Sequence, residues 1–267
     1  MLEIQIPVSE RISFVYAERG YLEADGHALV LRRETGSIQL PIGNVTAILV
    51  LPGTVVTHAA VKVCAREGCL LMWIGEGGIR CYSAGNPGRS ADALLKQASF
   101  FLDPVRRRLV AGRIFRHMFS EDPPAFFTVD QLRGKEGAKV RTLYMELANQ
   151  AGIAWHGRDS TGNSSDSLNM AISFANAALY GLVEAVILAV GYAPSIGYVH
   201  TGDPRSFVFD VSDCVKFKTS VPLAMDVYRE STFDLEGRVR RASRDMFLKS
   251  KLAGRIVSIL DGLLSDG

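Results

Sequence analysis

The pattern of apolar and polar positions changes about a third of the way along the chain. Before residue 85, short runs of β-branched and aromatic side chains are separated by turn pairs such as Asp25-Gly26 and Thr35-Gly36. These runs predict strands at residues 11–16, 28–33, 37–40, 45–50, 70–74 and 79–83. One amphipathic helix is expected among them over about residues 57–67, with Thr57 as its N-cap and Gly68 just past its end.

From residue 91 to residue 264 the apolar positions follow the helical period instead, and prolines such as Pro104 and Pro222 separate the candidate helices. Strands followed by helices predict the α+β class. We expect an N-terminal β-rich domain over residues 1–85 and a C-terminal all-α domain over residues 91–267. A Gly/Pro/Ser-rich hinge is expected at 84–90, and the polar stretch 157–166 is expected to form a loop.

Composition places the chain among folded proteins, because 48% of its 267 residues are hydrophobic and 22% are charged. The apolar segment 168–190 has the length of a membrane span, but it carries Glu184, and a carboxylate in lipid is costly. We therefore expect a buried helix and no membrane association. Four cysteines with no C-x-x-C pair, and a start unlike a signal peptide, predict reduced thiols in a cytoplasmic protein.

Basic residues are concentrated in two blocks of a chain whose formal net charge is only +2. Residues 80–116 hold eight basic and two acidic side chains, and residues 238–255 hold seven basic and one acidic. Both blocks favour arginine, which grips phosphate with two parallel hydrogen bonds. They indicate a surface for a polyanion, and the alternative is two solvated helix faces with local ion pairs.

Several common catalytic signatures do not occur in the sequence. There is no G-x-x-x-x-G-K-[ST], G-x-G-x-x-G, H-E-x-x-H or G-x-S-x-G motif. NTPase, dinucleotide-binding, zincin and α/β-hydrolase functions therefore lose their usual support.

Glu136 is unusual because it falls on the apolar face of a predicted helix. The helix is expected to begin near Thr128, with Gln131 completing a capping box. The face continues through residues 132, 136, 140, 143, 147 and 151. A carboxylate turned inward must be paired, protonated or bound to a metal. Glu136 is therefore a candidate metal ligand, and the alternative role is a salt bridge to a neighbouring arginine.

Asp210, Asp213 and His200 form a second group of candidates. Asp203-Pro204 is typical of a helix start and predicts a helix over 204–217, on which Asp210 and Asp213 share a face. Two close carboxylates repel each other unless a cation lies beside them, and the alternative is a solvent-exposed acidic pair. His200 precedes this helix in a loop, where it can ligate a metal or simply be hydrogen-bonded.

Together, Glu136, His200 and the aspartates form an oxygen-rich set with one imidazole, which suits Mg²⁺ or Mn²⁺ better than structural zinc. Such a site can promote phosphoryl chemistry on nucleic acid. Glu184 is a rival to Glu136 as a ligand. It is the last member of a polar stripe on an otherwise apolar helix. This stripe either lines the same pocket or forms hydrogen bonds with buried neighbours. Its members are Asn169, Ser173, Asn176, Tyr180 and Glu184.

Four segments carry a resemblance to a known family. They are LPGTVVTHAA (51–60), MWIGEGGIRCYSAG (72–85), QLRGKEGAKVR (131–141) and GYAPSIGYVHTGDPRSFVFDVSDCVKF (191–217). With them the sequence resembles the CRISPR-associated integrase, the larger subunit of the spacer-acquisition complex of type I, subtype E. The resemblance covers nearly the whole chain and implies the same β-then-α order.

The resemblance implies a divalent-metal nuclease and integrase whose ligands fall on Glu136, His200 and Asp213, with Asp210 as a supporting acidic position. It also implies that Arg80, Arg240 and Arg244 lie near DNA, and we expect the same of the arginine run Arg106, Arg107 and Arg108. The implied partners are double-stranded DNA (spacer precursor and CRISPR repeat), a second copy of the chain, and a dimer of a small adaptation subunit in a hetero-hexamer.

The sequence departs from the family pattern at two places. Arg19 stands where relatives of this subtype have an aromatic side chain that braces the end of the DNA duplex, and the Pro-rich C-terminal tail of many relatives does not follow Leu264. Two other functions remain open at this point. One is a non-catalytic dimeric DNA scaffold with a vestigial acidic pocket, and the other is a metal phosphohydrolase of small phosphate esters.

Overall fold

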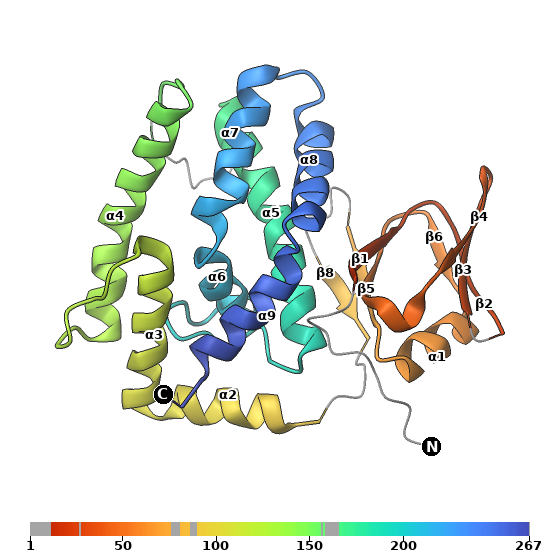
Figure 1. The fold of residues 1–267 in the computed structure, drawn as a ribbon, viewed down its shortest axis with the longest axis horizontal. Coiled ribbons are helices and arrows are strands. Elements are labelled where there is room, and N and C mark those ends of the chain that lie inside the picture. The colour runs from red at the N-terminus through yellow and green to blue at the C-terminus, as the bar shows by residue number, and fades with distance from the viewer. Residues whose placement is uncertain are drawn as a thin grey trace.

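Strands occupy the first third of the chain and helices the rest, as the sequence predicts (Figure 1). The computed structural model describes residues 12–26, 28–75, 81–85, 90–155, 157 and 166–266. The β-rich part contains two four-stranded sheets. The first has the order β1 (Ile12–Ala17), β5 (Val45–Val50), β7 (Leu70–Ile74), β8 (Cys81–Ala84), and the second has the order β4 (Gly36–Leu40), β3 (Ala28–Arg33), β2 (Gly20–Asp25), β6 (Thr54–Val56).

Two of these strands, β2 and β6, are not predicted by the local pattern. Strand β2 carries Glu23 and Asp25, residue types that are depleted in strands, and β6 has only three residues. Hydrogen bonds to neighbouring strands stabilise β2 despite its low strand propensity, because β2 pairs antiparallel with β3 on one side and parallel with β6 on the other. The predicted strands 11–16 and 79–83 begin outside the described residues, and their described parts lie in β1 and β8.

Helix α1 (His58–Arg66) begins as its cap predicts. The Thr57 hydroxyl accepts a hydrogen bond from the Ala60 amide at 3.2 Å, and Gly68 follows the helix with a left-handed φ of 62°. Helix α1 packs with the second sheet and one face of the first, so that a small core forms between the two sheets.

Strand β5 is buried on both faces, as expected of a central parallel strand. Its side chains alternate between two cores, because successive residues of a strand point to opposite faces. Ile48 and Val50 face the small core between the sheets, whereas Ala47 and Leu49 belong to the large core of the helices. The first sheet is therefore shared by both halves of the molecule.

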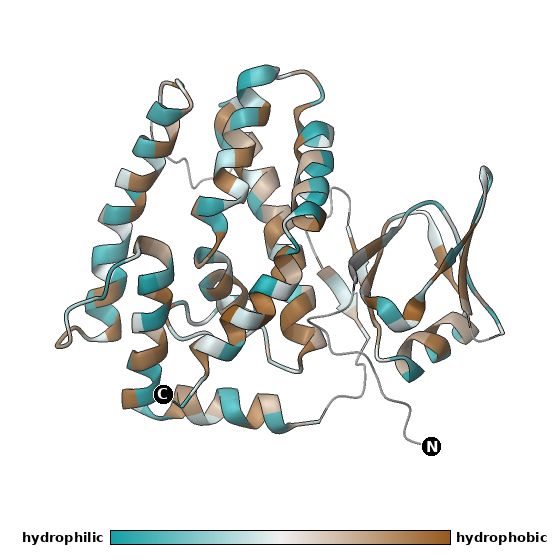
Figure 2. Ribbon diagram, in the orientation of Figure 1, coloured by the Kyte–Doolittle hydropathy of each residue, from teal (hydrophilic) through white to brown (hydrophobic). Residues whose placement is uncertain are grey.

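Helix α5 (Ser167–Ala189) runs through the middle of the helical part and is the expected buried helix. By length and composition it could cross a membrane, but most of its apolar stretch is buried inside the molecule. It packs against α6 (Ser206–Asp213), α7 (Ser220–Glu230), α8 (Leu235–Lys249) and α9 (Leu252–Leu263). In Figure 2 α5 is largely hydrophobic, while hydrophilic residues are frequent along α8.

Helices α3 (Pro104–Phe119) and α4 (Val129–Gln150) lie at the side of this bundle that is remote from the second sheet, and α2 (Asp92–Leu102) runs along its lower end (Figure 1). Helix α2 leads into α3, and α4 packs against α3. Asp103 caps α3 through hydrogen bonds from the amides of Val105 and Arg106, and Pro104 occupies the first turn.

The helix predicted over 204–217 is shorter in the structure. Helix α6 spans Ser206–Asp213 and a 3₁₀ turn covers Lys216–Lys218. Asp203 accepts a hydrogen bond from the Arg205 amide at 2.7 Å within a preceding turn, so it is not the N-cap. The Ser206 amide donates to the Asp203 carbonyl at 3.0 Å and closes a turn before the helix. A Cβ on Gly197 would lie 2.7 Å from the backbone of Ser206, so only glycine lets the preceding loop approach α6 this closely.

Candidate metal centre

Three side chains from distant parts of the sequence meet at one point of the helical part. They are Glu136 on α4, His200 in the loop before α6, and Asp213 at the last residue of α6. One ligand atom from each residue lies within 4.8 Å of the others. Glu136 and His200 are half-buried, and Asp213 is buried. The structure thus brings together the three residues that the sequence selects as metal ligands.

Glu136 is carried by a helix whose start is strongly determined. The Thr128 hydroxyl accepts from the Gln131 amide at 3.3 Å, and the Gln131 side chain accepts from the Thr128 amide at 2.8 Å. This is the predicted capping box. Leu132 is buried one turn before Glu136, and Val140 and Leu147 farther along the same face pack against the core, so the apolar stripe of α4 turns Glu136 inward.

Asp210 lies beside the ligand cluster and orients it. It is fully buried and accepts hydrogen bonds from the amides of Tyr198, Val199 and His200 at 2.5, 3.1 and 2.9 Å. Its Oδ1 also lies 2.8 Å from Nδ1 of His200. With Nδ1–H donating to Asp210, Nε2 of the imidazole is left to face a metal. The alternative of a solvent-exposed acidic pair is wrong, because Asp213 is buried as well.

Lys216 adds a largely buried cation that the sequence analysis did not select. Its Nζ lies 2.6 Å from Oδ1 of Asp213, one helical turn away. Burial disfavours the charged form of Lys216, but the negative charge of Asp213 outweighs it and raises the pKa of Lys216 above its ordinary value. Its spacing of three residues from Asp213 was the only signal for it in the sequence.

Gln97 is a second residue that the sequence analysis missed. It is buried on α2, donates to the carbonyls of Ala193 and Ile196 at 3.0 and 2.9 Å, and accepts from the Ala193 amide at 2.8 Å. The Tyr198 hydroxyl donates to the Gln97 carbonyl at 3.0 Å. These bonds hold the segment that leads to His200. An uncharged amide on the apolar side of a helix was its only sequence signal.

The protonation of the cluster reflects crowded carboxylates. Burial and the nearby negative charge of Asp213 raise the pKa of Glu136 to about 7, against the smaller opposing effects of His200 and Lys216. Burial lowers the pKa of His200, but the hydrogen bond to Asp210 and the carboxylates around it outweigh burial, so that this pKa is raised. Glu136 forms no ion pair with an arginine among the residues that the structure describes, so the salt-bridge alternative has no support there.

The donor set fits a small divalent cation. Two carboxylates and one imidazole converge on a depression of about 430 Å³, which is also lined by Tyr180, Phe209 and Lys216. A cation between the carboxylates relieves their repulsion, and hard oxygen ligands with one nitrogen suit Mg²⁺ or Mn²⁺. A bound cation supplies Lewis-acid polarisation of a phosphodiester at this point.

The rival ligand Glu184 lies apart from this cluster. Burial raises its pKa, and the charge that opposes this shift comes from Arg205. The polar stripe of α5 is in fact divided between both expected roles. Tyr180 lines the metal depression, whereas the Asn176 amide oxygen accepts a buried hydrogen bond from Ser220 at 2.8 Å.

The first arginine block makes contacts within the chain. Arg107 donates to the Tyr198 carbonyl at 3.2 Å and lies over the Phe101 ring, and Arg108 donates to the Phe127 carbonyl at 2.8 Å. Arg106 lies 3.7 Å from a carboxylate oxygen of Asp266. Arg80 lies outside the described residues. A DNA contact by any of these arginines stays a prediction.

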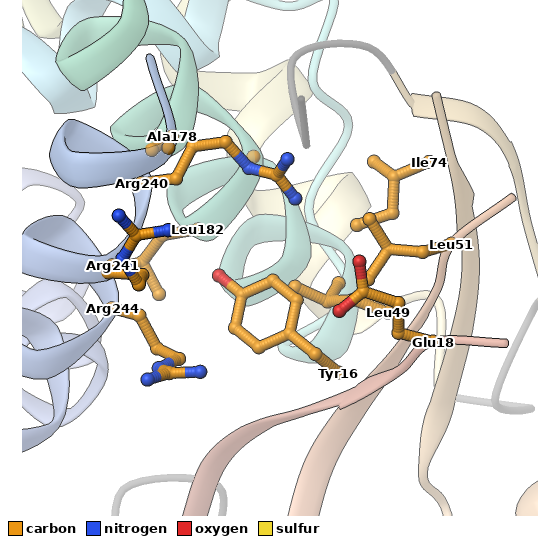
Figure 3. A pocket seen from close by; sticks show the side chains of 12 residues that line it. Tyr16, Glu18, Leu49, Leu51, Ile74, Ala178, Leu182, Arg240, Arg241 and Arg244 are labelled. Carbon is orange, nitrogen blue, oxygen red and sulfur yellow. The ribbon is translucent and has the colours of Figure 1, made fainter. Parts of the chain in front are cut away.

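The second block faces the strands. Arg240 and Arg244 on α8 line a pocket with Tyr16 of β1 (Figure 3). Arg19, at the position of the expected aromatic residue, has a left-handed φ of 47° in the turn between β1 and β2 and lies beside Gly53. The roles of these residues toward DNA also stay predictions.

Comparison with known proteins decides the family. The model of the family described as CRISPR associated protein Cas1 matches residues 14–121 and 119–219. The chain belongs to the Cas1 family. The three residues of the metal cluster all lie within the matched region of this Cas1-family chain.

Relatives cover almost the whole chain. The CRISPR-associated endonuclease Cas1 of Geobacter sulfurreducens is 45% identical, across 98% of this chain and 87% of that protein. Its counterpart from Escherichia coli is 42% identical, across 98% and 88%. A crystal structure of a TtCas1–DNA complex shares the fold with a TM-score of 0.81 and 33% identity, over 97% of this chain and 98% of that one.

Proposed function

We propose that the chain is a metal-dependent DNA endonuclease and integrase that inserts spacer DNA into a CRISPR repeat array. The observation that carries this proposal is the convergence of Glu136, His200 and Asp213 in a chain of the Cas1 family. The relatives are named as endonucleases, and one solved relative is a complex with DNA.

The reaction that suits this site is a transesterification. The 3′-hydroxyl of the incoming strand attacks a phosphorus of the repeat, a new 3′-oxygen–phosphorus bond forms, and the repeat strand leaves with its own 3′-hydroxyl. Glu136 and Asp213 would hold the cation together with His200, and the Asp210 hydrogen bond keeps the imidazole oriented. Lys216 offsets part of the carboxylate charge next to the attacked phosphate.

The finer assignments belong to the same proposal. We infer Mg²⁺ or Mn²⁺ as the cation from the donor set, and double-stranded DNA as substrate from the arginine blocks and the DNA-bound relative. Homodimer formation and a hetero-hexamer with a small adaptation subunit follow from the family resemblance alone. The cytoplasmic location follows from the cysteine usage and the start of the sequence.

Strand joining on a repeat-containing DNA with Mn²⁺ tests the proposal. Glu136→Gln and His200→Ala should each lower the joining rate by at least about 100-fold, because each removes a metal ligand. Glu146→Gln is the matched control, since Glu146 lies exposed on the same helix α4, and it should join at the wild-type rate.

Two results would contradict the proposal. Full activity of both ligand variants would mean that the site is assigned wrongly. Tight, salt-sensitive DNA binding by the wild type, with no product under any divalent cation, would instead support the non-catalytic scaffold.

A further inference from the structure

Helix α2 carries apolar side chains on two opposite sides. On the side that faces the bundle, Phe100 is buried together with Gln97. On the other side Leu95 and Leu102 recur seven residues apart, and 65% and 77% of these residues are exposed. A helix that is apolar all round is normally covered on both sides, so the outer side of α2 is one that a partner would cover.

The outer side of α2 continues into the start of α3. Val105 follows Leu102 by three residues and is 78% exposed. In Figure 1 α2 runs along the lower end of the helical part, and no labelled helix or strand lies below it in this view. We define the α2 face as the apolar residues of this outer side: Leu94, Leu95, Ala98, Leu102 and Val105.

The size of the α2 face suits a specific but weak contact. Its exposed area is roughly 500 Å² per copy, which is as large as the largest apolar patch of a typical monomer and is a mark of an interaction site. Two such faces in contact bury about 1,000 Å², the lower limit for a specific protein–protein interface.

Charges of opposite sign stand at the two ends of the α2 face. Asp92 lies in the first turn of α2 and forms no ion pair with another described residue. Arg106 lies on α3, and the nearest carboxylate oxygens of Asp103 and Asp266 are 3.9 and 3.7 Å from it, which is too far for a hydrogen bond. Ala98, the smallest side chain of the face, lies about midway between the two ends.

We propose that the α2 face binds the α2 face of a second copy of the chain, with the two α2 helices antiparallel and crossing at Ala98. A two-fold contact requires one surface to carry both complementary charges, and here Asp92 of each copy meets the end of the other that carries Arg106. A small side chain at the crossing allows the helix axes to approach to about 8 Å. This inference deepens the proposed function, because it names a contact surface of the proposed homodimer.

Pairing through α2 leaves the metal depression open, because none of the residues that line the depression belongs to this helix. Gln97, on the inner side of α2, binds the segment that leads to His200. The second copy therefore rests on the outer side of the helix whose inner side helps to position a metal ligand.

Cross-linking of the full-length chain tests the two-fold axis. A residue on this axis lies opposite its own copy, so the thiols of two Ala98→Cys chains should form a disulfide when copper phenanthroline and oxygen oxidise them. We expect at least about tenfold more covalent dimer than in the wild type on a non-reducing gel. The matched control is Ser99→Cys, an exposed neighbour that points about 100° away around the helix and should cross-link like the wild type.

Sedimentation velocity tests the apolar contact. Leu102→Glu places a carboxylate against apolar side chains, so it should raise the dissociation constant of this contact by at least about tenfold and halve the mass of the largest species. The variant should fold, because Leu102 is 77% exposed in the single chain. Ser99→Glu adds the same charge beside the α2 face and should sediment like the wild type.

Charge reversal tests the antiparallel arrangement. Arg106→Asp and Asp92→Arg should each weaken self-association by roughly three- to tenfold, because each brings like charges together. The double variant should associate like the wild type. Failure of the double variant to recover would show that the two charges do not face each other.

The remaining outcomes separate this contact from the proposed function. If Leu102→Glu keeps the wild-type mass while the wild type joins strands, the α2 face is assigned wrongly and the proposed function stands. If Ala98→Cys does not cross-link but Leu102→Glu abolishes binding of the small adaptation subunit, the face belongs to that partner instead. If Ala98→Cys cross-links but the wild type joins no strands, the contact stands and the proposed function fails.

Discussion

At the residue scale, Asp210 and Asp213 show how different partners give two identical buried side chains different roles. Asp213 presents an oxygen to the ligand cluster, whereas Asp210 is saturated by three backbone amides and the imidazole of His200. A carboxylate that accepts this many hydrogen bonds fixes the loop that carries His200. Asp210 is therefore a positioning residue, and its effect on the metal passes through His200.

The variant Asp210→Asn tests this role. The amide removes the charge and places a donor against backbone donors, so we expect strand joining to fall by about 10- to 100-fold and the affinity for Mn²⁺ to fall with it. Asp226→Asn, an exposed position on α7, is the matched control. Unchanged Mn²⁺ affinity in Asp210→Asn would show that His200 is oriented by other contacts.

A pH dependence of metal binding follows from the raised pKa values. Since the pKa of Glu136 is about 7 and that of His200 is also raised, protons compete with the cation as pH falls through this range. We expect the apparent Mn²⁺ affinity to drop by up to about tenfold per pH unit for each proton displaced. Calorimetric titrations between pH 5.5 and 8 measure it, and a flat profile would contradict the assignment of Glu136.

The same shift predicts an opposite trend for stability without metal. The folded-state pKa of Glu136 is raised above its unfolded value, so its contribution to stability is present below the unfolded pKa and is lost as pH rises through about 7. In EDTA the melting temperature should therefore decline over this window. Glu136→Gln should flatten the decline, and an unchanged slope in that variant would assign the trend to other groups.

At the element scale, α2 and α3 act as a brace for the loop between α5 and α6. Gln97 bonds to Ala193 and Ile196, and Arg107 bonds to the carbonyl of Tyr198. The last part of that loop carries His200. The position of the metal ligand thus depends on two helices that contribute no ligand themselves.

Replacement of Gln97 tests the brace. Gln97→Leu keeps the volume but leaves buried backbone groups unpaired, at a cost of roughly 1–3 kcal/mol for each. We expect a lower melting temperature and a lower joining rate at saturating Mn²⁺, with unchanged DNA affinity. Lys96→Leu, at the exposed neighbouring position of α2, should retain the wild-type rate. A wild-type joining rate in Gln97→Leu would mean that the hydrogen bond of Arg107 is sufficient to hold the loop that carries His200.

At the scale of the whole molecule, the first sheet joins the two halves. Ala47, Leu49, Leu70, Met72 and Ile74 lie in the same core as α5, while alternate residues of the strands face the second sheet. Unfolding of either half alone would expose this apolar surface to water, which costs free energy. We therefore expect the β-rich and helical parts to unfold together.

The two tryptophans allow this to be measured. Trp73 lies on β7, and Trp155 follows α4, where it stacks on Tyr144. In Trp73→Phe and Trp155→Phe variants, the remaining indole should report the same denaturant midpoint. Leu49→Ala should lower the free energy of unfolding by about 2–5 kcal/mol. Both indoles should therefore report a denaturant midpoint that is lowered by the same amount. Separate midpoints would show that the halves unfold independently.

Local chemistry in the sequence was enough for the order of strands and helices, for the starts of α1 and α4, and for the inward position of Glu136. Capping and periodicity act within four residues of the chain, so they are visible without a fold. The pattern also singled out a small group of candidate ligands, because carboxylates and a histidine are unusual among apolar neighbours. The family resemblance was needed to select Glu136 over Glu184 and Asp213 over Asp210.

Contacts across the fold decided the rest. Strands β2 and β6 exist because neighbours pair with them, and the loop before α6 approaches that helix closely only because Gly197 has no side chain. The buried roles of Asp210 and Gln97 depend on partners that lie 10 to 99 residues away. The pattern of residues along the chain does not show which distant groups will face each other. The tertiary structure determines these contacts, because burial and hydrogen bonding must be satisfied at the same time in three dimensions.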